Sequence, residues 1–316
     1  MTESFIQNPD EPTTELISAP EQGQDEPGAS LWSDAWRIMR GRPLFWISAG
    51  LIVIFVLMSL VPQLFTSTDP AYCDLSLARL PPDSSAWFGY DLQGCDVYSR
   101  TIYGARSSIL VGVLTVIATV FIGGTLGIIA GFTGGWVDAL LSRIADVFFA
   151  IPLLLGGIII MYTFRSPPGT AYSLIVGKVV FALAILYWPN IFRLMRSSVL
   201  QVKPNEYVLA ARALGAGPAR IILSHVLPNA VAPVIVVATI DLGAFITTEA
   251  ALSFLGIGLQ PPAISWGIAI SEASGLGYIA AAPHMLLFPS LFLSLAVLGF
   301  IMLGEVIRDA MDPKLR

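Results

Sequence analysis

Six long apolar segments constrain the fold of this chain more than any other feature of its sequence. An α-helix needs about 20 mostly apolar residues to cross about 30 Å of hydrocarbon. Six stretches meet this length: residues 44–65, 107–131, 144–164, 171–192, 230–255 and 286–307. We find no sustained alternation of polar and apolar residues, which a transmembrane β-barrel would require. Because a bilayer admits only segments that satisfy their own backbone hydrogen bonds, the sequence predicts an all-α integral membrane protein with six spans.

The composition excludes several other classes of protein. Charged residues make up 12% of the chain and hydrophobic residues 55%, whereas soluble domains carry about 25% charge. An ordinary soluble enzyme is therefore excluded, and the mean hydropathy of +0.75 argues against general disorder. The basic residues lie between apolar runs rather than on one polar face, so nucleic-acid binding is not expected.

The distribution of Lys and Arg predicts the orientation. Loops rich in these residues stay in the cytoplasm, and six spans place both termini on one side. If that side is cytoplasmic, its flanks hold Arg37, Arg40, Arg42, Arg143, Arg193, Arg196, Lys203, Arg212, Arg220, Arg308, Lys314 and Arg316. The outside then holds only Arg79, Arg100, Arg106 and Arg165. We therefore expect both termini in the cytoplasm and a multi-pass protein of the cell membrane.

The segments before the first span differ in character. Residues 1–30 contain seven acidic residues and no Lys or Arg, and they lack the basic start of a signal peptide. We expect a disordered acidic cytoplasmic tail. Residues 31–43 mix tryptophan with arginine, which is typical of a short interfacial helix. Residues 44–316 form the predicted transmembrane domain.

Both cysteines, Cys73 and Cys95, fall in a predicted outer loop, residues 66–106. In an oxidising compartment they can form a disulfide, but two free, buried thiols are equally compatible with the sequence. No histidine lies near them, so the sequence offers no metal site.

The chain carries no recognisable catalytic motif. It lacks a G-x-x-x-x-G-K-[ST] phosphate loop, an H-E-x-x-H pair and a G-x-S-x-G elbow. Its only histidines, His225 and His284, are predicted on opposite sides of the membrane. We expect no enzymatic activity and no ATP hydrolysis by this chain alone.

Small and ionisable residues inside the spans indicate how helices pack. Gly123, Gly127 and Gly131 recur every four residues, which allows two helix backbones to approach closely. We expect this contact within one subunit, with a dimer interface as the alternative. The ionisable residues are Asp146, Lys178, Asp241 and Glu249.

Three of these four charges have predicted partners. Lys178 and Glu249 would form an ion pair if the fourth and fifth spans touch, and Asp146 would pair with Arg143 three residues before it. Solitary intramembrane charges also suit proton or sodium sites, so an ion-coupled secondary transporter remains an alternative function.

Residues 203–229, on the predicted cytoplasmic side, are predicted to form two short helices joined by a glycine turn, called here the elbow. Asn205 is placed to cap the first helix, and Gly215 ends it. Pro218 begins the second helix, and Pro228 is expected to stop it. Each arm is about ten residues, or ~15 Å, long and cannot cross a membrane.

Both arms carry apolar faces. The first presents Tyr207, Ala210, Ala211 and Leu214, and the second presents Ile221, Ile222 and Val226. An apolar face in the cytoplasm indicates either a groove on a partner protein or a helix that rests on the membrane surface.

The elbow resembles the EAA loop of ABC-importer permeases. The matching positions are Ala210, Ala211, Gly215, Leu227 and Pro228. Leu209 stands where the loop has its glutamate, and His225 stands where it has a later isoleucine.

Further blocks are similar to the C-type permease subunit of dipeptide and oligopeptide importers. They are "FGYDLQGCDVYSRTIYGARSS" (88–108), "AGFTGGWVD" (130–138), "AARALGAGPARIILSHVLPN" (210–229), "EAALSFLGIGLQPPAISWG" (249–267) and "RDAMDPKLR" (308–316). Cys95 replaces an arginine that is common in this family, which supports a lineage-specific disulfide with Cys73.

The resemblance implies a type I ABC importer permease fold and a multisubunit assembly. The expected partners are a second homologous permease, two ATP-binding subunits that hold ATP and Mg²⁺, an extracytoplasmic solute-binding protein and the lipid bilayer. This chain itself would hold no cofactor. Peptide is the expected cargo, with nickel, glutathione or other small solutes as alternatives.

The same resemblance assigns expected roles to residues. The coupling loop, 199–229, would contact the ATPase through Glu206, Tyr207, Ala210, Ala211, Arg212, Leu214, Gly215, Arg220, Leu227 and Pro228. Residues 256–285 would form an outer re-entrant element, or else an ordinary external loop. The expected pathway and outer-gate residues are Asp241, Glu249, Gln260, Pro261 and Trp266.

Overall fold

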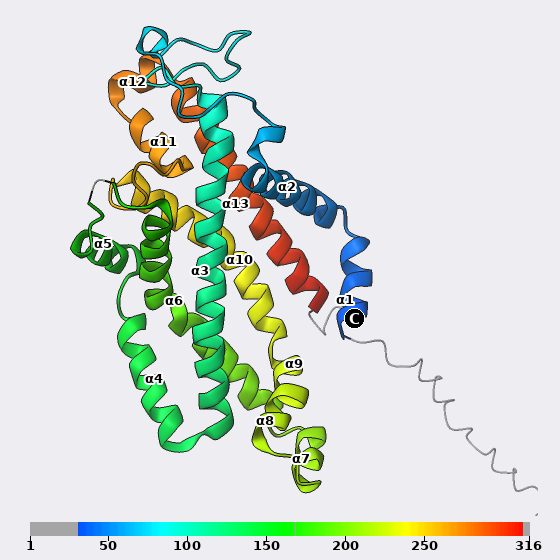
Figure 1. The fold of residues 1–316 in the computed structure, drawn as a ribbon. Helices are drawn as coiled ribbons and strands as arrows, with labels where there is room; N and C mark the ends of the chain where they lie inside the picture. The colour runs from blue at the N-terminus through cyan, green and yellow to red at the C-terminus, as the bar shows by residue number, and fades with distance from the viewer. Residues whose placement is uncertain (1–30, 168, 312–316) are drawn as a thin grey trace, which may run out of the picture.

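The computed structural model describes residues 31–167 and 169–311. The predicted acidic tail, 1–30, and the C-terminal residues Lys314 and Arg316 lie outside the described residues. The described chain is predominantly helical and forms an elongated bundle (Figure 1). A short helix, α1 (Leu31–Arg40), occupies the predicted interfacial segment.

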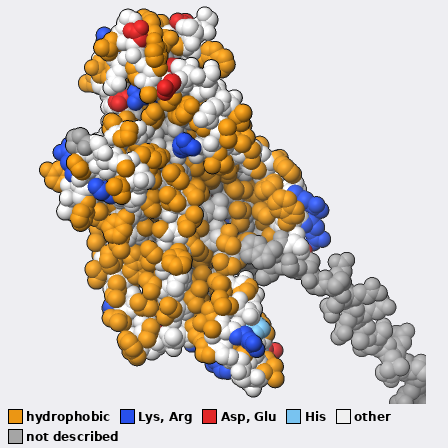
Figure 2. Space-filling view, in the orientation of Figure 1, with side chains coloured by type: hydrophobic (Ala, Val, Ile, Leu, Met, Phe, Trp, Pro, Cys, Tyr) orange, Lys and Arg blue, Asp and Glu red, His pale blue; other side chains and the backbone are white. Residues whose placement is uncertain are grey.

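The long helices of the bundle are α2 (Pro43–Leu60), α3 (Val97–Thr133), α6 (Tyr172–Val202), α10 (Ala232–Phe254) and α13 (His284–Met311). Each is long and apolar enough to cross a membrane. Between its two ends, the visible surface of the bundle is predominantly hydrophobic (Figure 2). This surface is what contact with lipid tails requires, because hydrocarbon offers no partner for polar groups.

The third predicted span, 144–164, is not one continuous helix. The structure has α4 (Gly135–Phe149) and α5 (Leu153–Thr163) instead, and the two are bent by 82°. Pro152 occupies the N-cap position of α5, where its missing N–H costs no helical hydrogen bond. The expectation of six spans holds if this bent pair counts as one.

The most extensive helix contact of the bundle lies between α3 and α6, at the predicted glycine stripe. A Cβ atom on Gly123 would lie 2.5 Å from the carbonyl oxygen of Trp188, and one on Gly127 would lie 2.7 Å from that of Phe192. A Cβ atom on Gly131 would lie 2.9 Å from the Val199 side chain. The prediction of glycine-mediated packing within one subunit is therefore confirmed, because only hydrogen leaves room for the α6 backbone.

Ion pairs fasten α4 to the same helix. Arg196 of α6 donates from Nη2 to Asp138 Oδ2 at 2.7 Å, and Arg193 donates from Nη2 to Asp146 Oδ1 at 2.7 Å. The predicted pair of Asp146 with Arg143 is present at 3.6 Å. Its shorter contact to Arg193 shows that tertiary packing, not the local spacing, supplies the main partner.

The predicted ion pair between Lys178 and Glu249 does not form. Lys178 Nζ donates to Ser166 Oγ at 3.1 Å, whereas Glu249 Oε1 accepts from Ser253 Oγ at 2.7 Å. The expectation was wrong because a similar depth in the membrane does not fix the direction in which two side chains point around their helices.

Candidate functional site

The predicted elbow projects from one end of the bundle as a chain of short helices (Figure 1). Its first arm is α7 (Glu206–Ala213). The second arm runs through α8 (Pro218–Ile221), one π-helical turn (Ile222–Val226) and α9 (Leu227–Ala230), and it leads into α10 after Val231. Isolated helices this short are marginal in water, so tertiary contacts must hold the elbow in place.

Buried side chains supply those contacts. Val208, Ile221 and Val226 pack in one hydrophobic cluster with Val199 and Val202 of α6. Ile221 and Val226, expected on an exposed apolar face, are therefore buried, and Ile222 is half-buried. The expectation failed because the second arm is apolar on more than one side, and the sequence does not specify which side meets α6.

A second apolar group on the elbow remains exposed and is called here the elbow surface. It consists of Tyr207, Leu209, Leu214 and Leu223. Leu214 is 88% exposed. Among the described residues, neither Arg212 nor Arg220 beside it forms an ion pair. The elbow surface thus offers apolar and cationic groups together.

The turn between the two arms depends on Gly215. Its φ is +81°, and a Cβ atom there would meet nothing within 4 Å. This conformation favours glycine because side chains on L-residues are strained in it. Pro218 begins α8 as expected, at a position where proline lacks no needed hydrogen bond.

Two details of the elbow differ from expectation. Asn205 occupies the N-cap position of α7, but its side chain makes no cap and donates instead to Tyr207 Oη at 3.1 Å. Pro228 does not stop the second arm, because it lies in the first turn of α9, where an N–H is not required. The chain breaks three residues later, at Val231, before α10 begins.

The remaining coupling-loop candidates divide between surface and core. Glu206, Ala210 and Arg220 are exposed, as are Arg212, Gly215 and Pro228, whereas Ala211 and Leu227 pack against the buried cluster. The exposed candidates and the elbow surface therefore share one protruding end of the molecule. Their contact with an ATPase remains a prediction.

At the opposite end of the bundle, residues 256–285 form a tight turn and two short helices. The turn folds back on α10, where Ser253 Oγ donates to Glu249 and accepts from the Leu259 N–H at 2.9 Å. α11 (Trp266–Ala273) packs against α3, α10 and α13, and α12 (Leu276–Ala281) follows it. This hydrogen-bonded turn fixes one wall of a cavity.

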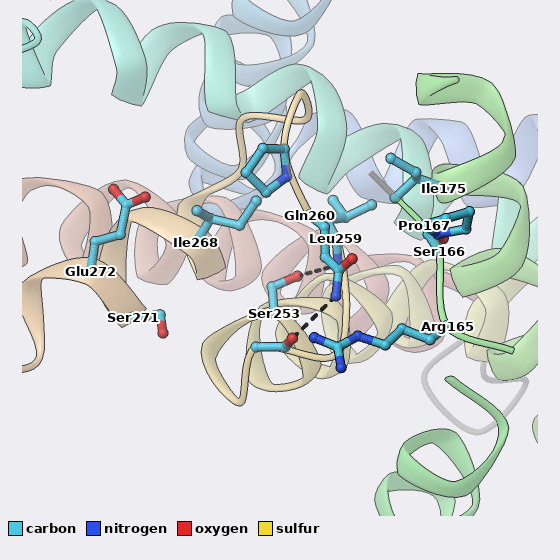
Figure 3. A pocket seen from close by; sticks show the side chains of 12 residues that line it. Arg165, Ser166, Pro167, Ile175, Ser253, Leu259, Gln260, Ile268, Ser271 and Glu272 are labelled. Atoms are coloured by element: carbon cyan, nitrogen blue, oxygen red, sulfur yellow. Dashed lines mark hydrogen bonds between the residues drawn. The ribbon is translucent and has the colours of Figure 1, made fainter. Parts of the chain in front are cut away.

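The cavity, called here the end cavity, has a volume of about 890 Å³ and lies between the α5–α6 connection, the α10–α11 turn and α11 (Figure 3). Apolar side chains such as Ile175, Leu259 and Ile268 form much of its wall. Arg165, Gln260 and Glu272 are among the polar residues that line it. Volumes of about 300–1,000 Å³ are typical of small-molecule sites.

The five expected pathway residues fall in different places. Gln260 and Pro261 line the end cavity. Trp266 does not; it is fully buried, and its Nε1–H donates to the Thr101 carbonyl at 2.9 Å. Trp266 therefore fastens α11 to α3, and its expected place at the outer gate stays a prediction.

Asp241 and Glu249 are buried in α10 and do not line the end cavity. Asp241 Oδ1 accepts from the Tyr187 hydroxyl at 2.7 Å, while its Oδ2 has no partner. Glu249 also keeps one oxygen, Oε2, without a partner. No group of three or more metal-ligating side chains occurs within the described ranges.

An acidic network lies beside the end cavity. Arg100 at the start of α3 contacts both Asp91, with a short ion pair, and Glu272, whose Oε2 lies 3.4 Å from Nη1. Burial raises the pKa of Glu272 above its ordinary value, although the nearby charge of Arg100 opposes this shift. Sequence reasoning missed this network because Glu272 lies in α11, far along the chain from Asp91 and Arg100, and the three residues match no motif.

Cys73 and Cys95 form a disulfide in the loop that precedes α3. Cys95 also donates its backbone N–H to Asp91 Oδ1 at 2.9 Å. The bridge therefore closes the loop next to the residue that holds Arg100.

The double replacement of Cys73 and Cys95 by serine should loosen this loop without disturbing the helices. A bridge with a sequence separation of 22 residues contributes about 3 kcal/mol against opening on a chain-entropy model. Limited proteolysis should then cut residues 66–96 at least tenfold faster than in the oxidised wild type. Reductant-treated wild type should match the variant, and equal cutting rates before and after reduction would contradict a structural bridge.

Comparison with known proteins gives consistent results. A family model described as the binding-protein-dependent transport system inner membrane component matches residues 123–316. A second, described as the N-terminal transmembrane domain of oligopeptide transport permease C, matches residues 30–82.

Individual relatives match nearly the whole chain. The oligopeptide transport system permease protein OppC of Bacillus subtilis (strain 168) is 38% identical, covering 91% of each chain. The dipeptide transport system permease protein DppC of Alkalihalophilus pseudofirmus is 38% identical, covering 96% of each. The glutathione transport system permease protein GsiD of Pectobacterium atrosepticum is 36% identical, covering 90% of this chain and 92% of its own.

A solved structure shares the fold. A chain of the MetNI methionine ABC transporter, in an inward-facing conformation, superposes with a TM-score of 0.53. The two are 20% identical, and the match covers 67% of this chain and 96% of that one.

Proposed function

This chain belongs to the family of binding-protein-dependent transport system inner membrane components, and we propose on that basis that it imports dipeptides and oligopeptides. It is a multi-pass inner-membrane permease subunit of an ABC importer and not an enzyme. Such a permease works with an ATPase and a solute-binding protein. The specific partners proposed are a second, homologous permease, two ATP-binding subunits and one extracytoplasmic binding protein.

Peptide cargo is supported by relatives that cover almost the full length of the chain. Two with 38% identity are named for oligopeptide and dipeptide transport. The relative named for glutathione transport is 36% identical, and glutathione is itself a modified tripeptide. The observation that carries the proposal is therefore a shared preference for short peptide-like solutes among relatives of similar identity.

We propose that the elbow transmits work from the ATPase. Its exposed group, Tyr207, Leu209, Leu214 and Leu223, suits an apolar cleft on a partner. Its buried cluster joins the elbow to α6, so a force on the elbow would act on that helix as well. ATP binding can shift the conformation of the permease only if the closed ATPase binds the elbow with a different affinity than the open ATPase does.

The π-helical turn and the break at Val231 join the elbow to α10. Such an irregular segment accommodates a change of angle more readily than a regular helix does. A shift of the elbow would thus reach α10, and through the turn at Ser253 and Leu259 it would reach the end cavity.

ATP-dependent uptake by the reconstituted assembly tests this function. Purification in mild detergent should recover the chain with ATPase subunits. In proteoliposomes that also contain the binding protein, alanine peptides of two to four residues should enter only when ATP is present on the ATPase side. Uptake that persists without ATP, and that collapses with an ionophore, would instead support an ion-coupled transporter.

A matched pair of variants sharpens that comparison. In an ion-coupled transporter, Asp241→Asn should stop uptake, because Asp241 is a buried carboxylate with an unpartnered oxygen. In the proposed importer, Asp241→Asn should retain ATP-driven uptake, since asparagine can still accept the Tyr187 hydrogen bond. Tyr187→Phe provides the control for loss of that hydrogen bond alone.

A further inference from the structure

The end cavity carries an uncompensated negative charge on one side. Among the described residues, Arg100 is the one cation that pairs with the carboxylates of Asp91 and Glu272, so this network of three has one excess negative charge. The side chains of Asp91 and Arg100 are 10% and 14% exposed, whereas that of Glu272 is 33% exposed. Glu272 is also the one of the three that lines the cavity. The excess charge is therefore accessible to a ligand at Glu272.

The other side of the cavity carries an unpaired positive charge. Arg165 lies in the connection between α5 and α6, and in the described part of the chain it has no ion pair or hydrogen bond. Figure 3 shows its side chain reaching toward the α10–α11 turn, with Glu272 on the opposite side of the view. Beside it, Gln260 donates to the Gly256 carbonyl at 3.3 Å and keeps its own carbonyl oxygen free.

The wall between the two charges is mainly apolar, with Ile175, Leu259 and Ile268 contributing to it. The hydroxyls of Ser253 and Ser271 are already used as donors, to Glu249 and to the Phe254 carbonyl. Ser166, which also lines the cavity, accepts a hydrogen bond from Lys178 through its Oγ. The charged and amide side chains of the described cavity wall that can recognise a ligand are therefore Arg165, Gln260 and Glu272. A simple ion would make no favourable contact with the apolar wall, and a neutral apolar solute would leave both charges without a partner.

We propose that the end cavity is a transit site for short peptides, in which Arg165 binds the terminal carboxylate and Glu272 binds the terminal ammonium. A peptide carries these opposite charges at its two ends, with side chains of variable polarity between them. In a single amino acid the ammonium and carboxylate are bonded to one carbon atom, so they lie much closer together than the two ends of a tripeptide do. The transit role rests on the proposed function, whereas binding to the cavity can be measured separately.

The site must be weak so that it releases its cargo, and we expect dissociation constants of about 1 mM. The experiment uses the purified assembly of permeases and ATPases without the binding protein, so that only the membrane complex can bind. Three probes are compared by equilibrium dialysis: trialanine, trialanine amide, which lacks the carboxylate, and N-acetyl-trialanine, which lacks the ammonium.

Removing one charge of the cavity should weaken only the binding of peptides that carry the matching terminal group. Arg165→Gln should raise the dissociation constant for trialanine about fivefold and leave that for trialanine amide unchanged, because a charge-assisted hydrogen bond open to solvent is only moderately strong. Glu272→Gln should raise the dissociation constant for trialanine by a similar factor and leave that for N-acetyl-trialanine unchanged. Arg165→Lys should recover part of the affinity for trialanine.

The control is Arg79→Gln. Arg79 is an exposed arginine of the loop that precedes α3, and it does not line the cavity. This variant should bind all three probes as the wild type does. Co-purification with the ATPases verifies that each variant is folded and assembled.

The outcomes separate this inference from the proposed function. Undetectable trialanine binding to the wild-type assembly at about 10 mM, or equal effects of Arg165→Gln on trialanine and its amide, would overturn the transit site. ATP-dependent peptide uptake would then still support the importer. Conversely, terminus-selective binding without any ATP-dependent uptake would support the cavity assignment and overturn peptide import.

Discussion

Replacing Gly215 by aspartate is expected to abolish ATP-dependent uptake while the chain still inserts into the membrane. Gly215 has a φ of +81° and forms the turn between the two arms of the elbow. Any side chain strains this conformation by about 1–3 kcal/mol. Aspartate also places a carboxylate beside Leu214, on the surface proposed to enter the ATPase cleft. Uptake should fall by at least about a hundredfold, the equivalent of roughly 2.7 kcal/mol of lost coupling.

The control for this effect is Gly135→Asp. Gly135 also has a positive φ, of +59°, and a Cβ atom there would meet nothing within 4 Å. Gly135 is the first residue of α4 and lies outside the elbow. An acidic residue is favourable in the first turn of a helix. Gly135→Asp should therefore retain most uptake. Gly215→Asn distinguishes charge from strain, because asparagine tolerates positive φ better than most residues.

Three measurements evaluate Gly215→Asp together: the amount of chain in the membrane, the ATPase subunits that co-purify with it, and uptake. Normal insertion with lost uptake, and with detached or uncoupled ATPase, is expected. Full uptake by a stably inserted Gly215→Asp variant would refute the coupling role of the elbow.

The second large effect is expected at the contact of α3 with α6. A Cβ atom on Gly123 would lie 2.5 Å from the Trp188 carbonyl oxygen and 2.9 Å from the Phe192 backbone nitrogen. Because backbone atoms cannot rotate away as a side chain can, Gly123→Ala must push the helices apart. We expect the free energy of unfolding to fall by about 1–3 kcal/mol, as for other overpacked cores.

The next residue supplies a matched control. A Cβ atom on Gly124 would have one neighbour within 4 Å, the Met195 methyl group at 3.9 Å. Gly124→Ala should therefore be neutral or should stabilise the helix by up to about 1 kcal/mol, through its higher helix propensity. Denaturant titration of the purified chain in detergent measures both variants. Equal stabilities for Gly123→Ala and Gly124→Ala would refute the close α3–α6 contact.

The spans and the elbow were predictable because their signals are local. Long apolar runs fix which segments enter the membrane, whatever their neighbours are. The spacing of Gly123, Gly127 and Gly131 predicted a close helix contact, and Gly215 with Pro218 predicted a turn between short helices. These patterns depend on the backbone geometry of nearby residues, so the sequence could specify them.

The functional surfaces were less predictable. Both sides of the second elbow arm are apolar, and only packing against α6 buried Ile221 and Val226 while Leu223 stayed exposed. The sequence predicts Trp266 at an outer gate but does not show that its side chain is buried and hydrogen-bonded to Thr101. In each case the residue type allowed two environments, and a distant segment selected one.

The sequence by itself determined a helical membrane protein, the approximate limits of its spans, a glycine-mediated helix contact and the resemblance to ABC-importer permeases. Only the tertiary structure decided the 82° bend between α4 and α5, the partners of Asp146 and Glu249, and the cavity with Arg165 and Glu272 on its two sides. The physical reason is the distance along the chain between the residues that interact. Helix formation and membrane insertion follow from hydrophobicity and backbone hydrogen bonding along one segment, whereas ion pairs and cavities arise between segments whose relative rotation no local pattern encodes.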